Sequence, residues 1–344
     1  MPATDAHIRY VGRFDRRDPA GPRCQWPAST VQVRFQGTAL NVRLKETGED
    51  RFQIVVDSQP TLVLTPDKGE GLYRLASGLT FGPHEIDLVK RTEAFVGTAQ
   101  FEAFQLEKSG RLLSLPLRPA RKIEVIGDSI SSGYGNEGKN QNEHFSAATE
   151  NAYQAYGAVA ARTLGADYVC IAWSGRKMWP DYTIPEIYDR ALPLDPGSAW
   201  DFSKWVPDAV VINLATNDFG KGPPDQAKWT GAYEAFIAHL RQVYPKAEVY
   251  CASGSMMSDA WPPGQKALST LQAYLAQIVD DRRKAGDTRV HVIAFAPQDA
   301  GKDGIGADYH PSLKTHPIMA QTLAERLQKD LGWSQKPSAR RAKN

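Results

Sequence analysis

The C-terminal two thirds of the chain alternate between short apolar segments and longer segments with helical periodicity, and this alternation restricts the fold more than any other feature. The apolar segments are rich in valine and isoleucine and comprise residues 123–126, 168–172, 209–214, 249–252 and 290–295. The segments with helical spacing are residues 153–164, 229–243, 268–283 and 315–331. Short apolar strands that alternate with helices are typical of a parallel sheet with helices on both faces. We therefore predict an α/β domain built on five parallel strands.

The N-terminal third has a different rhythm, in which apolar and polar side chains alternate one by one. This period of two is clear at residues 31–36, 40–45 and 85–88, and glycine, proline and aspartate separate the runs. Such alternation predicts antiparallel strands that bury one face in a β-sandwich. We expect no long helix there, and the proline-containing stretch 116–119 marks the join between the two patterns.

These patterns divide the chain into a β-sandwich domain at 1–115, an α/β domain at 120–334 and a short tail at 335–344. The tail is basic and poor in apolar residues, so we expect it to be flexible. The overall net charge of +2 favours neither nucleic acid nor an acidic membrane as a partner. No apolar run is long enough to span a bilayer.

Two further compositional features bear on location and cofactors. The first ten residues lack the basic and then apolar pattern of a secretion signal, so the protein is either cytosolic or has lost a leader. Three cysteines without metal-ligand spacing predict no metal site, and we expect no cofactor. Cys170 and Cys251 lie within apolar strand-like runs, which favours buried free thiols.

A candidate nucleophile stands at the end of the first predicted parallel strand. There Gly127-Asp128-Ser129 leads into a turn rich in serine and glycine. A serine hydroxyl becomes nucleophilic when a neighbouring base takes its proton and N–H groups face the negative charge that develops. Because functional sites of parallel sheets lie beyond the carboxyl ends of the strands, Ser129 is well placed for catalysis.

Three other polar segments are predicted at the same edge of the sheet, and each supplies a helper for Ser129. His310 is the candidate base, and Asp308 is the candidate residue to orient it. The Asn217 amide and the backbone N–H groups of Ser129 and Gly175 are candidates for an oxyanion hole. Each segment also has a purely structural interpretation, as a turn, a helix cap or an exposed loop. Their joint occurrence at strand ends favours the catalytic interpretation.

The sequence resembles the SGNH (GDSL-type) hydrolases. The matching blocks are Gly127-Asp128-Ser129, Ser174-Gly175, Thr216-Asn217-Asp218 and Asp308-Tyr309-His310. The preceding sandwich and the stretches 9–14 and 306–312 narrow the resemblance to carbohydrate esterase family 2, over nearly the whole chain. This resemblance implies a jelly-roll front domain and a flavodoxin-like SGNH hydrolase domain. It also implies a secreted or periplasmic serine esterase that removes O-acetyl groups from xylan or glucomannan through an acyl-enzyme.

The chain departs from the SGNH pattern at three positions. Ala215 stands where many members carry glycine, and Ala307 stands three residues before the histidine, where many members carry the acid. Asp308 is two residues before His310, an arrangement found in some members of family 2, whereas others use a backbone carbonyl instead. Tyr309 occupies a position where family 2 members often have tryptophan.

Aromatic side chains near the predicted site are candidates to bind sugar rings, which present apolar faces. We expect Tyr309, Trp179 and Trp261 to contact substrate and Met256 to line the acyl pocket; the alternative for each is packing in a core. The exposed positions of the front domain are mostly charged or amide residues, so we interpret that domain as a buttress. The predicted partner is an acetylated polysaccharide or oligosaccharide, and the predicted state is a monomer.

Three alternatives remain at this point. A non-catalytic carbohydrate-binding protein would need neither Ser129 nor His310. A lipase or thioesterase on the same scaffold would act on longer acyl groups. A metal-dependent deacetylase would need clustered ligands, and His310, His316 and Asp308 form the one short-spaced group that fits.

Overall fold

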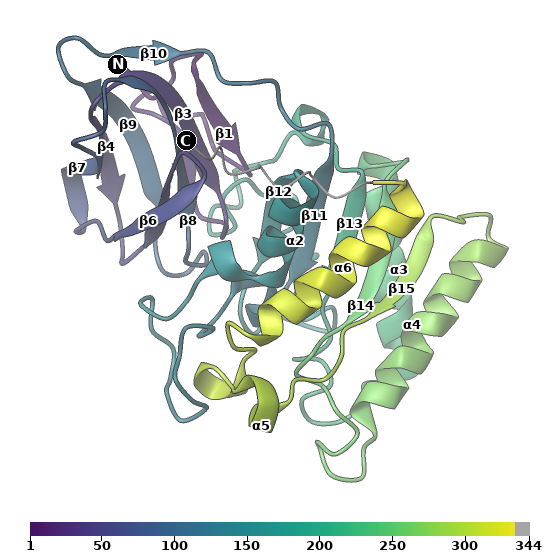
Figure 1. Cartoon of the computed structure of the whole chain (residues 1–344). Coiled ribbons are helices and arrows are strands. Elements are labelled where there is room, and N and C mark those ends of the chain that lie inside the picture. The colour runs from purple at the N-terminus through teal and green to yellow at the C-terminus, as the bar shows by residue number, and fades with distance from the viewer. Residues whose placement is uncertain (334–344) are drawn as a thin grey trace.

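The computed structural model describes residues 1–333, so the predicted tail at 335–344 lies outside the described part (Figure 1). The N-terminal part forms two antiparallel sheets, as predicted. A six-stranded sheet has the order β1-β3-β8-β5-β6, with β10 paired to β3, and a four-stranded sheet has the order β2-β9-β4-β7. Their strands are β1 (Ile8–Val11), β2 (Arg23–Cys24), β3 (Thr30–Gly37), β4 (Leu40–Glu46), β5 (Phe52–Val56), β6 (Gln59–Leu64), β7 (Gly69–Ala76), β8 (Gly82–Lys90), β9 (Ala99–Leu106) and β10 (Arg111–Leu113).

The C-terminal part contains the predicted five-stranded parallel sheet, in the order β12-β11-β13-β14-β15. The strands are β11 (Lys122–Gly127), β12 (Asp167–Ala172), β13 (Ala209–Asn213), β14 (Glu248–Ser253) and β15 (Val290–Ala294). Counted from β11, this is the 2-1-3-4-5 order of flavodoxin-like folds. Strand β12 is added on one side of β11 and the later strands on the other side, so the order of strands reverses between β11 and β13. The functional crevice of such a sheet opens at that point, and Ser129 directly follows β11.

The helices of this part match the predicted periodic segments. They are α2 (Tyr156–Leu164), α3 (Gln226–Val243), α4 (Ala267–Lys284) and α6 (Thr315–Leu331), with short α1 (Ser129–Ser132) and α5 (Ala300–Asp303) and 3-10 turns η1 (Ala152–Gln154), η2 (Phe202–Lys204) and η3 (Ala307–Tyr309). The helix expected from residue 153 begins later, because Ala155 is extended between η1 and α2. No helix within residues 1–333 is long and apolar enough to cross a membrane.

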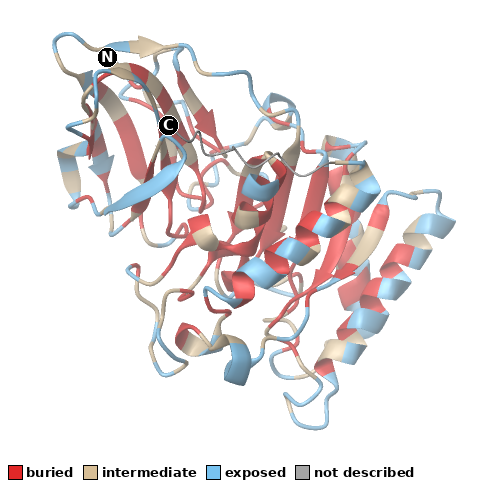
Figure 2. Cartoon of the chain, viewed as in Figure 1, coloured by how far each residue is buried: buried red, intermediate tan, exposed pale blue. Residues whose placement is uncertain are grey.

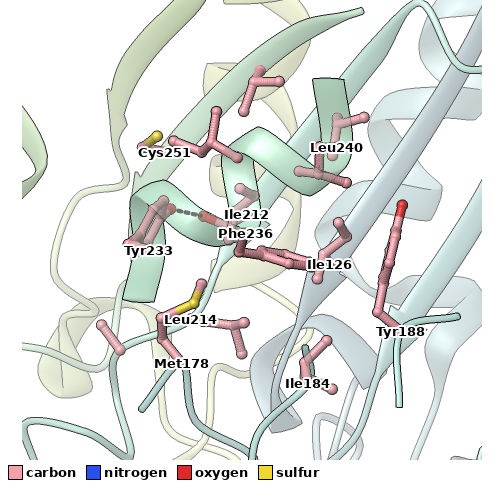
Figure 3. Packing of buried hydrophobic residues seen from close by; sticks show 14 of the residues in the cluster. Ile126, Met178, Ile184, Tyr188, Ile212, Leu214, Tyr233, Phe236, Leu240 and Cys251 are labelled. Carbon is pink, nitrogen blue, oxygen red and sulfur yellow. Dashed lines mark hydrogen bonds between the residues drawn. The ribbon is translucent and has the colours of Figure 1, made fainter. Parts of the chain in front are cut away.

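The strands of the parallel sheet consist mostly of buried residues (Figure 2). On one face, α3 and α4 pack over residues such as Ile126 and Ile212, and Figure 3 shows Phe236 and Leu240 of α3 in this cluster. On the other face, α2 and α6 pack over Val125 and its neighbours. A strand with apolar residues on both faces is buried on both, which explains the uninterrupted apolar runs of the sequence.

The sandwich and the parallel sheet share buried contacts. Trp26 and Ala94 of the N-terminal part belong to the hydrophobic cluster under α3. Arg13 forms a fully buried ion pair with Glu124 of β11 at 3.4 Å. These contacts agree with the interpretation of the front domain as a buttress, whereas the exact domain limits stay a prediction. Cys170 and Cys251 are buried free thiols, as expected.

Candidate active site

Ser129 lies in a tight strand-to-helix turn. β11 ends at Gly127, and Asp128 caps α1 by accepting a hydrogen bond from the Ile130 N–H at 3.1 Å. A Cβ atom at position 127 would lie 2.1 Å from the Ser131 hydroxyl oxygen, so this position requires glycine. The local sequence therefore dictates the turn that presents Ser129. Burial raises the pKa of Asp128 to about 7.

His310 meets Ser129 although 181 residues separate them in the chain. The Ser129 Oγ and His310 Nε2 atoms are 2.8 Å apart. On the other side of the imidazole, Nδ1 lies 3.1 Å from the Ala307 carbonyl oxygen. Since a carbonyl only accepts, Nδ1 carries the proton and Nε2 is left to accept the Ser129 proton. This arrangement is that of a nucleophile with its general base.

The Asp308 carboxylate makes no direct hydrogen bond to His310, which differs from the contact that the sequence suggested. Its carboxylate accepts a hydrogen bond from the Tyr134 hydroxyl at 2.7 Å and pairs with His144 Nδ1 at 2.8 Å. The physical reason is the backbone: Asp308 and Tyr309 adopt left-handed φ angles of 48° and 65°. In this conformation the Ala307 carbonyl, rather than the Asp308 carboxylate, occupies the site beside Nδ1.

Tyr134 is a site residue that the sequence analysis missed. Its ring stacks on the His310 imidazole, with centroids 4.1 Å apart and an interplanar angle of 30°. Its hydroxyl also donates to Asp308, so Tyr134 connects the base to the loop that carries it. The available signal was an aromatic residue within the serine- and glycine-rich turn after Ser129.

The Gly175 block forms a tight turn at the end of β12. The Arg176 N–H donates to the Trp173 carbonyl at 3.2 Å, and Gly175 has a φ of 76°, as in type II turns that need glycine at this position. The Trp173 N–H donates to the Gly127 carbonyl at 3.3 Å, which joins this turn to the turn that carries Ser129. Neither the Ser129 nor the Gly175 N–H finds an acceptor among residues 1–333, so both can serve a ligand.

Asn217 lies beside both turns. Its Nδ2 donates to the Arg176 carbonyl at 3.0 Å and lies 3.5 Å from the Asp128 carboxylate. One amide hydrogen thus positions the side chain, and the second lies at the outer limit of hydrogen bonding to Asp128, which leaves Asn217 a candidate donor to an oxyanion. Just before it, Ala215 has a φ of 144°, a region that favours glycine, which explains why many SGNH sequences have glycine there.

Three of the four predicted substrate-binding residues line one cleft of about 650 Å³. Met256, Trp261 and Tyr309 lie along it, with Asp308 and Thr216 at its wall. Trp261 and Tyr309 are 67% and 60% exposed, so both rings are available to a ligand rather than packed in a core. Trp179 lines a second hollow, of about 230 Å³, together with Asn217 and Asp218.

The geometry does not assemble a metal site from the candidate ligands. His316 is fully buried, and its Nδ1 accepts the Tyr156 N–H at 3.2 Å. Across the described 333 residues, no group of three or more histidine, cysteine, aspartate or glutamate side chains is arranged to hold a metal ion.

The pH dependence of catalysis follows from the surroundings of His310. Burial lowers its pKa to about 4, and the Ala307 carbonyl and the Asp308 charge offset only part of this effect. The imidazole is a base only when neutral, so kcat/KM should fall to half near pH 4 rather than near 6.5. Initial rates on an aryl acetate between pH 3.5 and 8 test this, with intrinsic fluorescence as the control for folding. Half-maximal activity near pH 6.5 would contradict it.

The Ala307 contact leads to a second prediction. Asp308→Asn should lower kcat by less than about tenfold, because the carbonyl that orients His310 is retained. Ser129 and His310 variants provide the comparison in the same assay. A loss as large as that of His310→Ala would show that the Asp308 charge is indispensable.

Comparisons with known proteins agree with this geometry. Residues 10–116 match the carbohydrate esterase 2 N-terminal family, and residues 125–318 match the GDSL-like lipase/acylhydrolase family. The chain is 41% identical over 332 residues to the cellulase/esterase CelE of Acetivibrio thermocellus, covering 95% of this chain but only 40% of CelE. It is 26% identical to an acetylxylan esterase/glucomannan deacetylase of Cellvibrio japonicus, covering 96% of this chain and 91% of that protein.

A solved structure extends the likeness to the whole fold. A family two carbohydrate esterase from Clostridium thermocellum, in complex with cellohexaose, superimposes with a TM-score of 0.90 at 40% identity, covering 95% of this chain and all of the other. The parallel sheet and the Ser129–His310 pair define a GDSL-type (SGNH) hydrolase. Within that class, the chain belongs to carbohydrate esterase family 2.

Proposed function

We propose that this protein is a serine esterase that removes O-acetyl groups from plant polysaccharides or oligosaccharides. The observation that carries the proposal is the 2.8 Å contact between Ser129 Oγ and His310 Nε2 beside an open, aromatic-lined cleft. A carbohydrate-binding protein without catalysis has no need for a hydroxyl and a neutral imidazole in this arrangement.

The proposed mechanism is acyl transfer in two steps. The Ser129 oxygen bonds to the acetyl carbon while His310 takes the hydroxyl proton. The N–H groups of Ser129 and Gly175 and the Asn217 amide stabilise the resulting oxyanion. The bond from the acetyl carbon to the sugar oxygen then breaks, and that oxygen receives the proton from His310. In the second step His310 takes a proton from water, whose oxygen bonds to the acetyl carbon. The bond between that carbon and the Ser129 oxygen breaks, His310 returns the proton to Ser129, and acetate leaves.

The proposed substrates are acetylated xylan and glucomannan. Support comes from the Cellvibrio relative named acetylxylan esterase/glucomannan deacetylase and from the Clostridium relative bound to cellohexaose. The exposed rings of Trp261 and Tyr309 provide apolar surfaces against which sugar faces can stack. We place the protein outside the cytoplasm, where such polymers occur, as a monomer that needs neither a cofactor nor nucleic acid nor a membrane.

Acetate release from acetylated xylan, acetylated glucomannan and an aryl octanoate tests this function. We expect release from at least one polysaccharide that disappears in Ser129→Ala, and slow hydrolysis of the octanoate. A preference for octanoate would instead support the lipase or thioesterase alternative, and release that persists in Ser129→Ala would overturn the mechanism.

A further inference from the structure

A buried glutamate from the β-sandwich part contacts the predicted oxyanion-hole turn. Glu93 follows β8 in the sequence, and its side chain is completely buried. One carboxylate oxygen accepts the Ser174 N–H at 2.5 Å, and the other accepts the Ser174 hydroxyl. The carboxylate therefore holds both donors of a residue that adjoins Gly175.

This contact limits how the Gly175 turn can move. Three hydrogen bonds hold the turn. The Asn217 amide donates to the Arg176 carbonyl, and the Trp173 N–H donates to the Gly127 carbonyl. The Ser174 N–H donates to the Glu93 carboxylate. The first two anchors come from the parallel-sheet part, and the third comes from the sandwich. Because Gly175 is exposed and lacks a side chain, these neighbours determine where its N–H lies.

Glu93 is itself held in place by its surroundings. Its backbone N–H donates to Glu150 Oε2 at 3.1 Å, and its carbonyl accepts from the Lys90 ammonium at 3.1 Å. Lys90 also forms a fully buried ion pair with Asp50 at 2.7 Å. Burial raises the pKa of both glutamates, and the Glu93 charge adds to the increase at Glu150, whose pKa lies well above its usual range.

We propose that Glu93 is a positioning residue for the esterase reaction, which aligns the Gly175 N–H with the oxyanion by holding Ser174. This inference rests on the proposed function. The sandwich part thereby contributes to the hydrolase site through a two-point hydrogen bond, which fixes the position of Ser174 more firmly than a single bond would. Its removal should raise the energy of the transition state more than that of the bound substrate, because the oxyanion exists only in the former.

A matched control separates this role from a general contribution to stability. Glu124 is also fully buried and also joins the two parts, through its ion pair with Arg13, and it accepts a hydrogen bond from the Tyr188 hydroxyl. It has no hydrogen bond to Ser174, Gly175 or Asn217. Glu124→Gln should therefore lower the melting temperature while leaving kcat within about threefold of the wild type.

The experiment measures kcat, KM and melting temperature on 4-nitrophenyl acetate for Glu93→Ala, Glu93→Gln, Ser174→Ala and Glu124→Gln. We expect Glu93→Ala to lower kcat roughly 10–100-fold with KM changed less than threefold, as expected for a small misplacement of a catalytic group. Glu93→Gln keeps an acceptor for the Ser174 N–H and should recover part of this loss. Ser174→Ala, which removes one of the two bonds, should lower kcat by about 3–10-fold without unfolding.

The outcomes distinguish the two proposals. Wild-type kcat in both Glu93→Gln and Ser174→Ala would overturn the role of Glu93, and so would equal losses of kcat in Glu93→Gln and Glu124→Gln. If Glu93→Ala does not fold, Ser174→Ala still tests the role of Glu93. Ser174 is partly exposed, so the loss of its hydroxyl should leave the protein folded. A wild-type enzyme without Ser129-dependent ester hydrolysis would refute the proposed function itself.

Discussion

Ser129→Ala should lower kcat on an aryl acetate by at least about 10⁴-fold, the largest effect that we expect from any single change. The substitution removes the atom that bonds to the acetyl carbon, and His310 then has no hydroxyl to activate. Steady-state kinetics, with the enzyme concentration taken from protein absorbance, would measure the loss. The melting temperature should change little, because the substitution removes one hydroxyl, whose hydrogen-bond partner in the site is His310.

Two comparisons make this result specific. Ser132→Ala removes another buried hydroxyl of the same short helix, one that donates to the Ser129 carbonyl at 3.1 Å, and should keep at least about a tenth of the activity. The double variant Ser129→Ala/His310→Ala should be no slower than the slower single variant, because the two residues act as a unit. Additive losses would mean that His310 acts without Ser129.

Asn217→Ala should lower kcat by roughly 10²–10³-fold, the second largest expected effect. The variant removes the proposed oxyanion donor and also the bond that holds the Arg176 carbonyl, and we expect both losses to act mainly on the transition state. Measurement of kcat and KM on the same aryl acetate tests this. A raised KM with unchanged kcat would show that Asn217 binds substrate without stabilising the oxyanion.

The fold was predictable because its signals are local. Strands buried on both faces must be apolar throughout, whereas strands buried on one face must alternate apolar and polar residues. Periodicity alone therefore distinguished the two antiparallel sheets from the parallel sheet. Helix α2 shows the limit of this approach, because it starts later than expected. Asn151 caps a 3-10 turn, and the extended Ala155 separates this turn from α2.

The site was predictable to the extent that topology implies proximity. Ser129, Gly175 and Asn217 follow the ends of three parallel strands, and such ends share one edge of the sheet. The contacts of Asp308 were not predictable in this way. They depend on two left-handed backbone angles within η3, which place a carbonyl where a carboxylate was expected.

By itself, the sequence determined the two kinds of sheet and their order along the chain, and it selected Ser129 and His310 as the candidate nucleophile and base, since these depend on spacing and periodicity. Only the tertiary structure decided that the Ala307 carbonyl contacts His310, that Tyr134 stacks on it and that Glu93 reaches Ser174. These contacts join residues whose distance in space depends on loop conformation and on how the sandwich packs against the sheet. A periodic pattern carries no information about either, because it records only which face of an element is buried.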